Sequence, residues 1–111
     1  MEVKLSANNE ITKTFEVISD VSGELSIFVS KAFDEDSDAH FLVISIPELP
    51  KLKVLKIQFP IKFDNEKDRD AAFDTELNEK WVESILTQIE DSIINNNKAA
   101  MEKSNDSPID N

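Results

Sequence analysis

The chain has no cysteine, only one glycine and only one histidine among its 111 residues. Without cysteine there is no disulfide framework, no thiolate metal site and no thiol nucleophile. One glycine cannot build a glycine-rich phosphate loop, and one histidine without cysteine cannot complete a zinc site. These absences exclude many common catalytic and metal-binding motifs. We therefore expect a protein that is not an enzyme and that uses no cofactor or metal.

Basic residues are also scarce, because 12 Lys and Arg stand against 23 Asp and Glu, for a net charge of −11. An excess of negative charge repels the phosphates of nucleic acids and anionic membranes, so we expect neither as a direct partner. It favours a protein partner with a basic surface. The alternative is that the acidity only keeps the protein soluble.

Long apolar runs are absent as well. No segment reaches the roughly 18 consecutive apolar residues of a membrane span, and the opening sequence MEVKLSANNE lacks the basic and then apolar order of a signal peptide. We expect a soluble, cytoplasmic protein. The length and the 40% hydrophobic content suit a single domain over residues 1–97, followed by a flexible polar tail over residues 98–111.

One helix is predicted over residues 73–94, because its apolar residues recur with a 3.6-residue period. They are Phe73, Leu77, Trp81, Val82, Ile85, Leu86, Ile89 and Ile93. We expect Leu77, Trp81, Ile85 and Ile89 to be buried against the rest of the domain.

Ahead of this helix, alternation of apolar and polar residues predicts strands at 2–7, 10–18, 24–33, 40–46 and 51–63. Short turns between them favour an antiparallel meander, so the predicted fold is a two-layer α+β domain with the helix on one sheet face. Residues 40–46, HFLVISI, are apolar in both phases, as in a strand covered on both sides. The second sheet face must therefore meet a loop, another segment or a second copy of the protein, and we expect self-association there.

Two smaller patterns have ordinary explanations. Asp34, Asp36 and Asp38 alternate like the first ligands of a calcium loop, but Ala39 and Ser45 stand where that loop needs glycine and a bidentate glutamate. A solvated acidic loop is the better interpretation. The only cationic stretch, residues 51–63, carries four lysines and no acidic residue. It is either a small anion-binding stripe or the protection of an edge strand against aggregation.

The acidic residues near the predicted helix suggest a function. Carboxylates three or four positions apart on a helix lie about 5–6 Å from each other, similar to phosphates along a nucleic-acid strand. We predict a partner-binding acidic face made of Asp64, Glu66, Asp68, Asp70, Glu76, Glu79, Glu83 and Glu90. It would occupy a basic groove of a protein that normally takes nucleic acid.

A small acidic meander followed by one helix resembles, in general form, accessory proteins of phages and mobile elements. Some of these inhibit host nucleases by presenting an acidic surface in place of DNA, which implies an inhibitor of that type. A sheet followed by a long helix also resembles SecB-like export chaperones. That second resemblance implies the alternative function, a chaperone or structural oligomer subunit that works through an exposed apolar sheet face.

Overall fold

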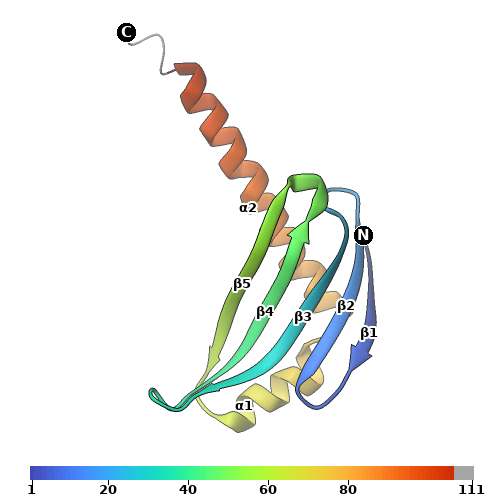
Figure 1. Ribbon diagram of the computed structural model, residues 1–111, viewed down its shortest axis with the longest axis vertical. Helices are drawn as coiled ribbons and strands as arrows, with labels where there is room; N and C mark the ends of the chain where they lie inside the picture. Colours follow the sequence, from blue (N-terminus) through green and yellow to red (C-terminus); the bar gives the residue numbers. More distant parts are fainter. Residues whose placement is uncertain (107–111) are drawn as a thin grey trace.

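The computed structural model describes the backbone of residues 1–106 and the side chains of residues 1–97. Five strands form one antiparallel sheet, in the same order in the sheet as along the chain. They are β1 (Glu2–Asn8), β2 (Thr12–Ser19), β3 (Gly23–Asp34), β4 (Ala39–Leu49) and β5 (Val54–Phe63). Two helices follow, α1 (Glu66–Ala71) and α2 (Glu79–Asp106). The predicted α+β meander is confirmed (Figure 1).

The helices cover one face of the sheet and leave the other face uncovered by any described element. In Figure 1 the strands lie in front, and α2 runs diagonally behind them and past the upper end of the sheet. The core lies between these two layers. Its side chains include Phe15, Val17, Ile27, Val29, Leu42, Ile44 and Ile46 from the strands and Phe73, Leu77, Val82 and Leu86 from the helical part.

Two backbone features shape the upper end of the sheet. Gly23 has φ +96°, a conformation that favours glycine, and a Cβ there would come within 3.3 Å of Lys51 Cγ, a tight contact. The β4–β5 ladder is irregular at Lys56, whose φ is 55° and whose partner position, Pro47, is skipped. Proline has no N–H to donate, so the ladder is interrupted there.

The predicted long helix on one sheet face is confirmed as α2, but its predicted start at residue 73 is wrong, because the helical part is broken before Glu79. After α1 comes a π-helical turn, Ala72–Glu76, and the chain then leaves helical geometry at Leu77, with φ −84° and ψ 81°. Lys13 Nζ holds this break by donating to the carbonyl oxygens of Phe73 and Leu77, the second at 3.2 Å. Asn78 Oδ1 then accepts from the Trp81 N–H and caps the start of α2.

The break changes which residues of α2 are buried. Leu77 is buried as predicted, but Trp81, Ile85 and Ile89 are only half-buried. Among the described apolar side chains of α2, Val82 and Leu86 are fully buried. The helix is therefore rotated relative to the expected stripe, because α2 packs closely on β1 at one side of the sheet. Its other apolar flank faces β5, whose inward side chains stay half-buried.

The polar tail predicted for residues 98–111 falls outside the described side chains, and its flexibility stays a prediction. No helix in the described part of the chain is long and apolar enough to cross a membrane.

Candidate functional site

The eight predicted acidic residues do not form one surface. Six of them are exposed: Asp64, Glu66, Asp68, Glu76, Glu79 and Glu83. The helix break at Leu77 and Asn78 separates Glu76 from Glu79, so among the six exposed residues only Glu79 and Glu83 keep the spacing of four residues along one helix. The regular row of carboxylates expected on a single helix is therefore not present.

Glu90 corrects the prediction most clearly, because its side chain is buried at 3% exposure and cannot contact a partner. Its Oε2 accepts hydrogen bonds from the hydroxyls of Ser19 and Ser22, each at 2.5 Å. Ser19 Oγ also accepts from the Ser22 N–H at 3.1 Å, which orders the turn between β2 and β3. Glu90 thus joins α2 to that turn and has a structural role.

Asp70, another residue of the predicted acidic face, forms ion pairs within the protein. Its Oδ1 forms ion pairs with Lys31 Nζ at 3.2 Å and with Arg69 Nη2 at 3.1 Å. Burial raises the pKa of Asp70, but the hydrogen bonds and charges of Lys31 and Arg69 outweigh it and leave the pKa below its usual value of 3.8. The negative charge of this carboxylate is balanced by the positive charges of Lys31 and Arg69, so it adds little to an acidic binding face.

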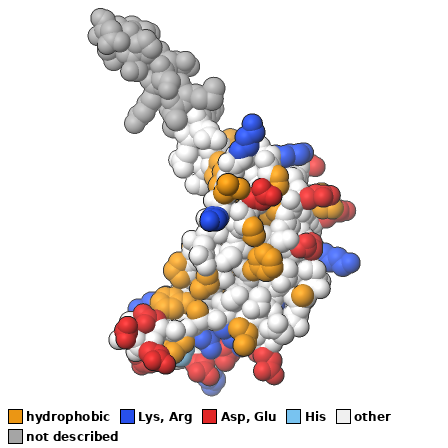
Figure 2. Space-filling view, viewed as in Figure 1, with side chains coloured by type: hydrophobic (Ala, Val, Ile, Leu, Met, Phe, Trp, Pro, Cys, Tyr) orange, Lys and Arg blue, Asp and Glu red, His pale blue; other side chains and the backbone are white. Residues whose placement is uncertain are grey.

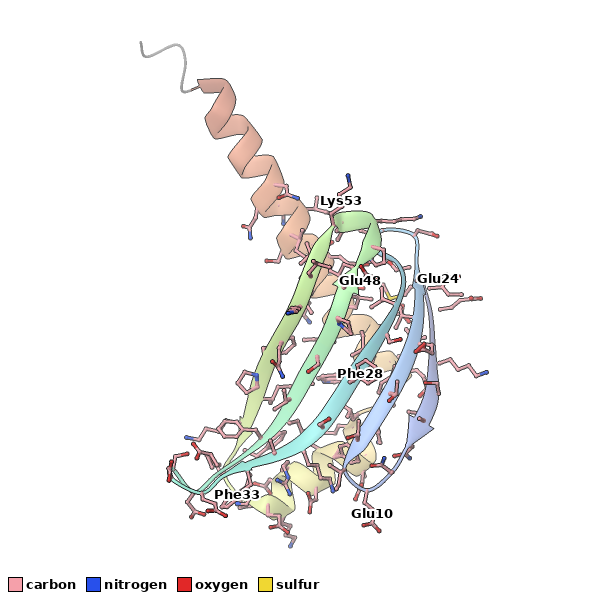
Figure 3. The ribbon with its side chains drawn as sticks, viewed as in Figure 1. Glu10, Glu24, Phe28, Phe33, Glu48 and Lys53 are labelled. Carbon is pink, nitrogen blue, oxygen red and sulfur yellow. The ribbon has the colours of Figure 1, made fainter. Side chains whose placement is uncertain are left out.

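The uncovered sheet face offers a different kind of surface. Two neighbouring rows of cross-strand partners carry no charged side chain, and we call them the uncharged band. One row is Thr14, Phe28, Ser45 and Gln58, and the other is Thr12, Ser30, Val43 and Pro60. Figure 2 shows hydrophobic side chains across the middle of this face, with most charged side chains toward its rim. Phe28 lies near its centre (Figure 3).

The β4 part of this face explains the apolar run over residues 40–46. Leu42, Ile44 and Ile46 point into the core and are at most 2% exposed, whereas Phe41 and Val43 lie on the uncovered side and are half-buried. The prediction that this strand lies inside the sheet is confirmed, because β4 pairs with β3 and β5, whereas cover over its second face stays a prediction. Within the described residues, no loop or segment lies over the second side.

A second apolar surface is the groove between β5 and α2, which the sequence prediction missed because it assigned the α2 residues to the core. Val54 and Ile57 line it from β5, and Ile85, Gln88, Ile89, Ser92 and Ile93 line it from α2. Its volume of about 530 Å³ falls within the range of about 300–1,000 Å³ that is usual for ligand sites. Ile85 and Ile89 are half-buried because they line this groove.

The remaining candidates from the sequence are isolated. Asp34 accepts from the Asp36 N–H and the Ser37 hydroxyl, at 3.1 and 2.9 Å, and so shapes the β3–β4 turn. The His40 ring stacks on Phe33 with a centroid distance of 4.7 Å. Among the described residues, no group of three or more His, Cys, Asp or Glu side chains is arranged to hold a metal ion.

Comparisons with protein-family models, with curated proteins and with solved structures find no match to this chain.

Proposed function

We propose that this protein is a non-enzymatic protein-binding module whose working surface is the uncharged band on the uncovered sheet face. It acts as a chaperone-like or structural subunit. One observation carries the proposal: 32% of all residues are charged, yet eight neighbouring side chains on this open face carry no charge. Surfaces of this kind, apolar in the middle and polar at the rim, are typical of protein–protein contacts.

The composition of the band supports a protein contact. Phe28 and Val43 supply apolar area at its centre, and the neighbouring serine and threonine side chains add hydroxyl groups for hydrogen bonds. Thr12 Oγ1 and Ser30 Oγ already share a hydrogen bond of 3.1 Å across two strands. A second sheet can pack face to face on such a surface at a spacing of about 10 Å.

The test is a single charge placed in the band. We expect Val43→Lys to fold normally, because the side chain lies on the uncovered side, and to abolish retention of partner proteins on the immobilised protein. Asn95→Lys, at an exposed position of α2, is the matched control and should retain them. Unchanged retention by the Val43 variant contradicts the proposal.

A second candidate function, an acidic inhibitor that occupies a basic groove, is supported by the six exposed carboxylates from Asp64 to Glu83. The salt dependence of partner binding distinguishes the two candidate functions. Between about 0.01 M and about 1 M salt the Debye length falls from about 30 Å to about 3 Å, so binding through carboxylates weakens steeply. Binding through the uncharged band persists. Reversing the charges of Glu79 and Glu83 should weaken partner binding only if the protein is an acidic inhibitor.

A further inference from the structure

The uncovered sheet face is hollowed where β1, β2 and the first half of β3 lie side by side. This open depression, which we call the hollow, has a volume of about 800 Å³, within the range of about 300–1,000 Å³ that is usual for ligand sites. Val17 and Leu25 are cross-strand partners buried in the core, so their neighbours along the strands point to the uncovered side. The side chains of the hollow are Glu2, Lys4, Glu16, Ile18, Glu24 and Ser26.

One row of cross-strand partners in the hollow is electrically balanced. It consists of Lys4, Glu16 and Ser26 on the three neighbouring strands. The Ser26 hydroxyl lies 2.5 Å from Glu16 Oε1 and 3.0 Å from Glu16 Oε2, and it donates to this carboxylate. Glu16 therefore has a hydrogen-bond partner within the protein, and the positive charge of Lys4 offsets its negative charge.

The next row carries two carboxylates and no positive charge. Its members are Glu2, Ile18 and Glu24, with Ile18 on the middle strand. The ion pairs among the described side chains both involve Asp70, so neither Glu2 nor Glu24 belongs to one. Ile18 is 50% exposed between them, and Figure 3 shows Glu24 at this end of the sheet. This row therefore presents an apolar surface with a negative charge on each side.

The spacing of this row suits one long cationic side chain. Neighbouring strands lie about 4.8 Å apart, so the backbones of Glu2 and Glu24 are about 10 Å apart, with Ile18 between them. An arginine has a planar guanidinium with five N–H donors, which can donate to carboxylates on two sides, and an apolar stem that can lie on Ile18. A lysine ammonium is compact and more strongly hydrated, so it fits this arrangement less well.

The surroundings of the hollow favour an arginine that belongs to a protein. The hollow is open on the uncovered face, so a small molecule would be contacted on one side only. Thr14 and Phe28 of the uncharged band follow Glu16 and Ser26 on the same side of β2 and β3. A protein surface can therefore extend over the hollow and the band together.

From these observations we propose that the hollow binds an arginine side chain in a basic segment of another protein. The guanidinium donates to Glu2 and Glu24, and the apolar stem of the arginine packs on Ile18. The carboxylate of Glu16 keeps its hydrogen bond from Ser26. The proposal does not depend on the function proposed above, because a short basic segment can fill the hollow without reaching Val43 in the uncharged band.

The test uses three peptides of about eight residues, which in extended form are long enough to cross β1, β2 and β3. They alternate serine with arginine, with lysine or with citrulline, which has the shape of arginine but no charge. NMR titration of the isotope-labelled full chain measures each affinity and shows which residues the peptide contacts. The net charge of −11 alone predicts equal binding of the arginine and lysine peptides.

The hollow predicts a different order of affinities. We expect the arginine peptide to bind at least about fivefold more tightly than the lysine peptide and at least about tenfold more tightly than the citrulline peptide. The largest changes in chemical shift should lie at Ile18 and at its cross-strand partners.

Matched charge variants locate the site. Glu2→Gln with Glu24→Gln should weaken binding of the arginine peptide at least about tenfold. Glu79→Gln with Glu83→Gln changes the net charge equally at exposed positions of α2, and should change the affinity less than about threefold. The NMR spectrum of each variant shows directly whether its fold is unchanged.

The apolar contact is tested without a change of charge. Ile18→Thr should weaken binding of the arginine peptide at least about threefold, because the apolar stem of the arginine loses its contact. Ile11→Thr, at an isoleucine that is 61% exposed in the β1–β2 turn, is the matched control and should leave the affinity unchanged. Val43→Lys should change the affinity less than about threefold and so separates this proposal from the proposed function.

Three results overturn the proposal. The first is equal or tighter binding of the lysine peptide, because charge alone then accounts for the affinity. The second is equal weakening by the two pairs of glutamine substitutions, which would mean that the peptide binds no particular carboxylates. The third is a set of chemical-shift changes that lies on the helical side of the protein, because the basic segment then binds the exposed carboxylates there.

Discussion

The carboxylate of Glu90 accepts a hydrogen bond of 2.5 Å from the hydroxyl of Ser22, and both side chains are buried. Ser19 donates to the same oxygen, so a residue near the middle of α2 is bound to the turn between β2 and β3. A buried carboxylate without a cationic partner is costly unless hydrogen bonds satisfy it. The two hydroxyls meet that need, and the pair fixes how α2 lies on the sheet.

Replacement of Glu90 should therefore reduce stability although the residue is acidic and the chain already has excess negative charge. We expect Glu90→Ala to lower the free energy of unfolding by about 1–3 kcal/mol, because two buried hydroxyls lose their acceptor. Urea denaturation measures the change. Glu83→Ala, at an exposed position of the same helix, is the control and should stay within about 0.5 kcal/mol of the original chain. Equal effects of the two changes would contradict the assigned role of Glu90.

The rotation of α2 predicts which of two substitutions in this helix lowers the free energy of unfolding more. Leu86 is fully buried, so Leu86→Ala should lower the free energy of unfolding by about 2–5 kcal/mol. Trp81 is larger but only half-buried, and we expect Trp81→Ala to cost less, about 1–2 kcal/mol. Chemical denaturation of both variants gives the order. A larger loss for the Trp81 variant would mean that the helix faces the sheet as the sequence pattern alone suggests.

Lys13 should hold the helix break in place. Its buried ammonium group donates to the carbonyl oxygens of Phe73 and Leu77 and lies 4.8 Å from the centre of the Phe73 ring. We expect Lys13→Met, which keeps the length of the side chain, to lower the free energy of unfolding by about 1–3 kcal/mol, because buried carbonyl groups lose their donor. Hydrogen exchange of residues 72–79 should accelerate more than that of the strands. Lys4→Met, on exposed β1, is the control, and equally fast exchange in that variant would argue against a local effect of Lys13.

The pKa of Asp70 predicts a small pH dependence at acid pH. Because Lys31 and Arg69 lower the pKa of this carboxyl in the folded protein, the folded state binds fewer protons there than the unfolded state. The stabilisation is therefore present above the ordinary pKa of 3.8 and is lost as the pH falls through the lowered value. The group is partly exposed, so solvent screening keeps the effect small.

Asp70→Asn should remove this dependence. We expect the free energies of unfolding of the original chain and the variant to differ near neutral pH and to converge only as the pH falls from 3.8 through the lowered pKa of Asp70. Denaturation at a series of pH values measures both curves, and Asp74→Asn, at an exposed residue close by, is the matched control. A constant difference across the whole range would show that the ion pairs of Asp70 do not cause the effect.

The sequence by itself determined the sheet and its order. Alternating residues such as those of β3 and short turns such as the one at Gly23 act locally, and the observed strands lie close to the predicted ones. The two-sided apolar pattern of β4 also indicated the uncovered face, because each phase of a strand points to one side of its sheet.

Only the tertiary structure decided where the helical part breaks and which way α2 faces. The break depends on Lys13, which is about 60 residues away in the sequence and appears there only as an interruption of a strand pattern. The burial of Glu90 depends on Ser19 and Ser22 in the same way. Periodicity identifies an apolar stripe but not the neighbour that it meets, because contacts between distant segments form only when the whole chain packs. For that reason an acidic residue predicted at a binding surface lies in the interior, and isoleucines predicted in the core line an open groove.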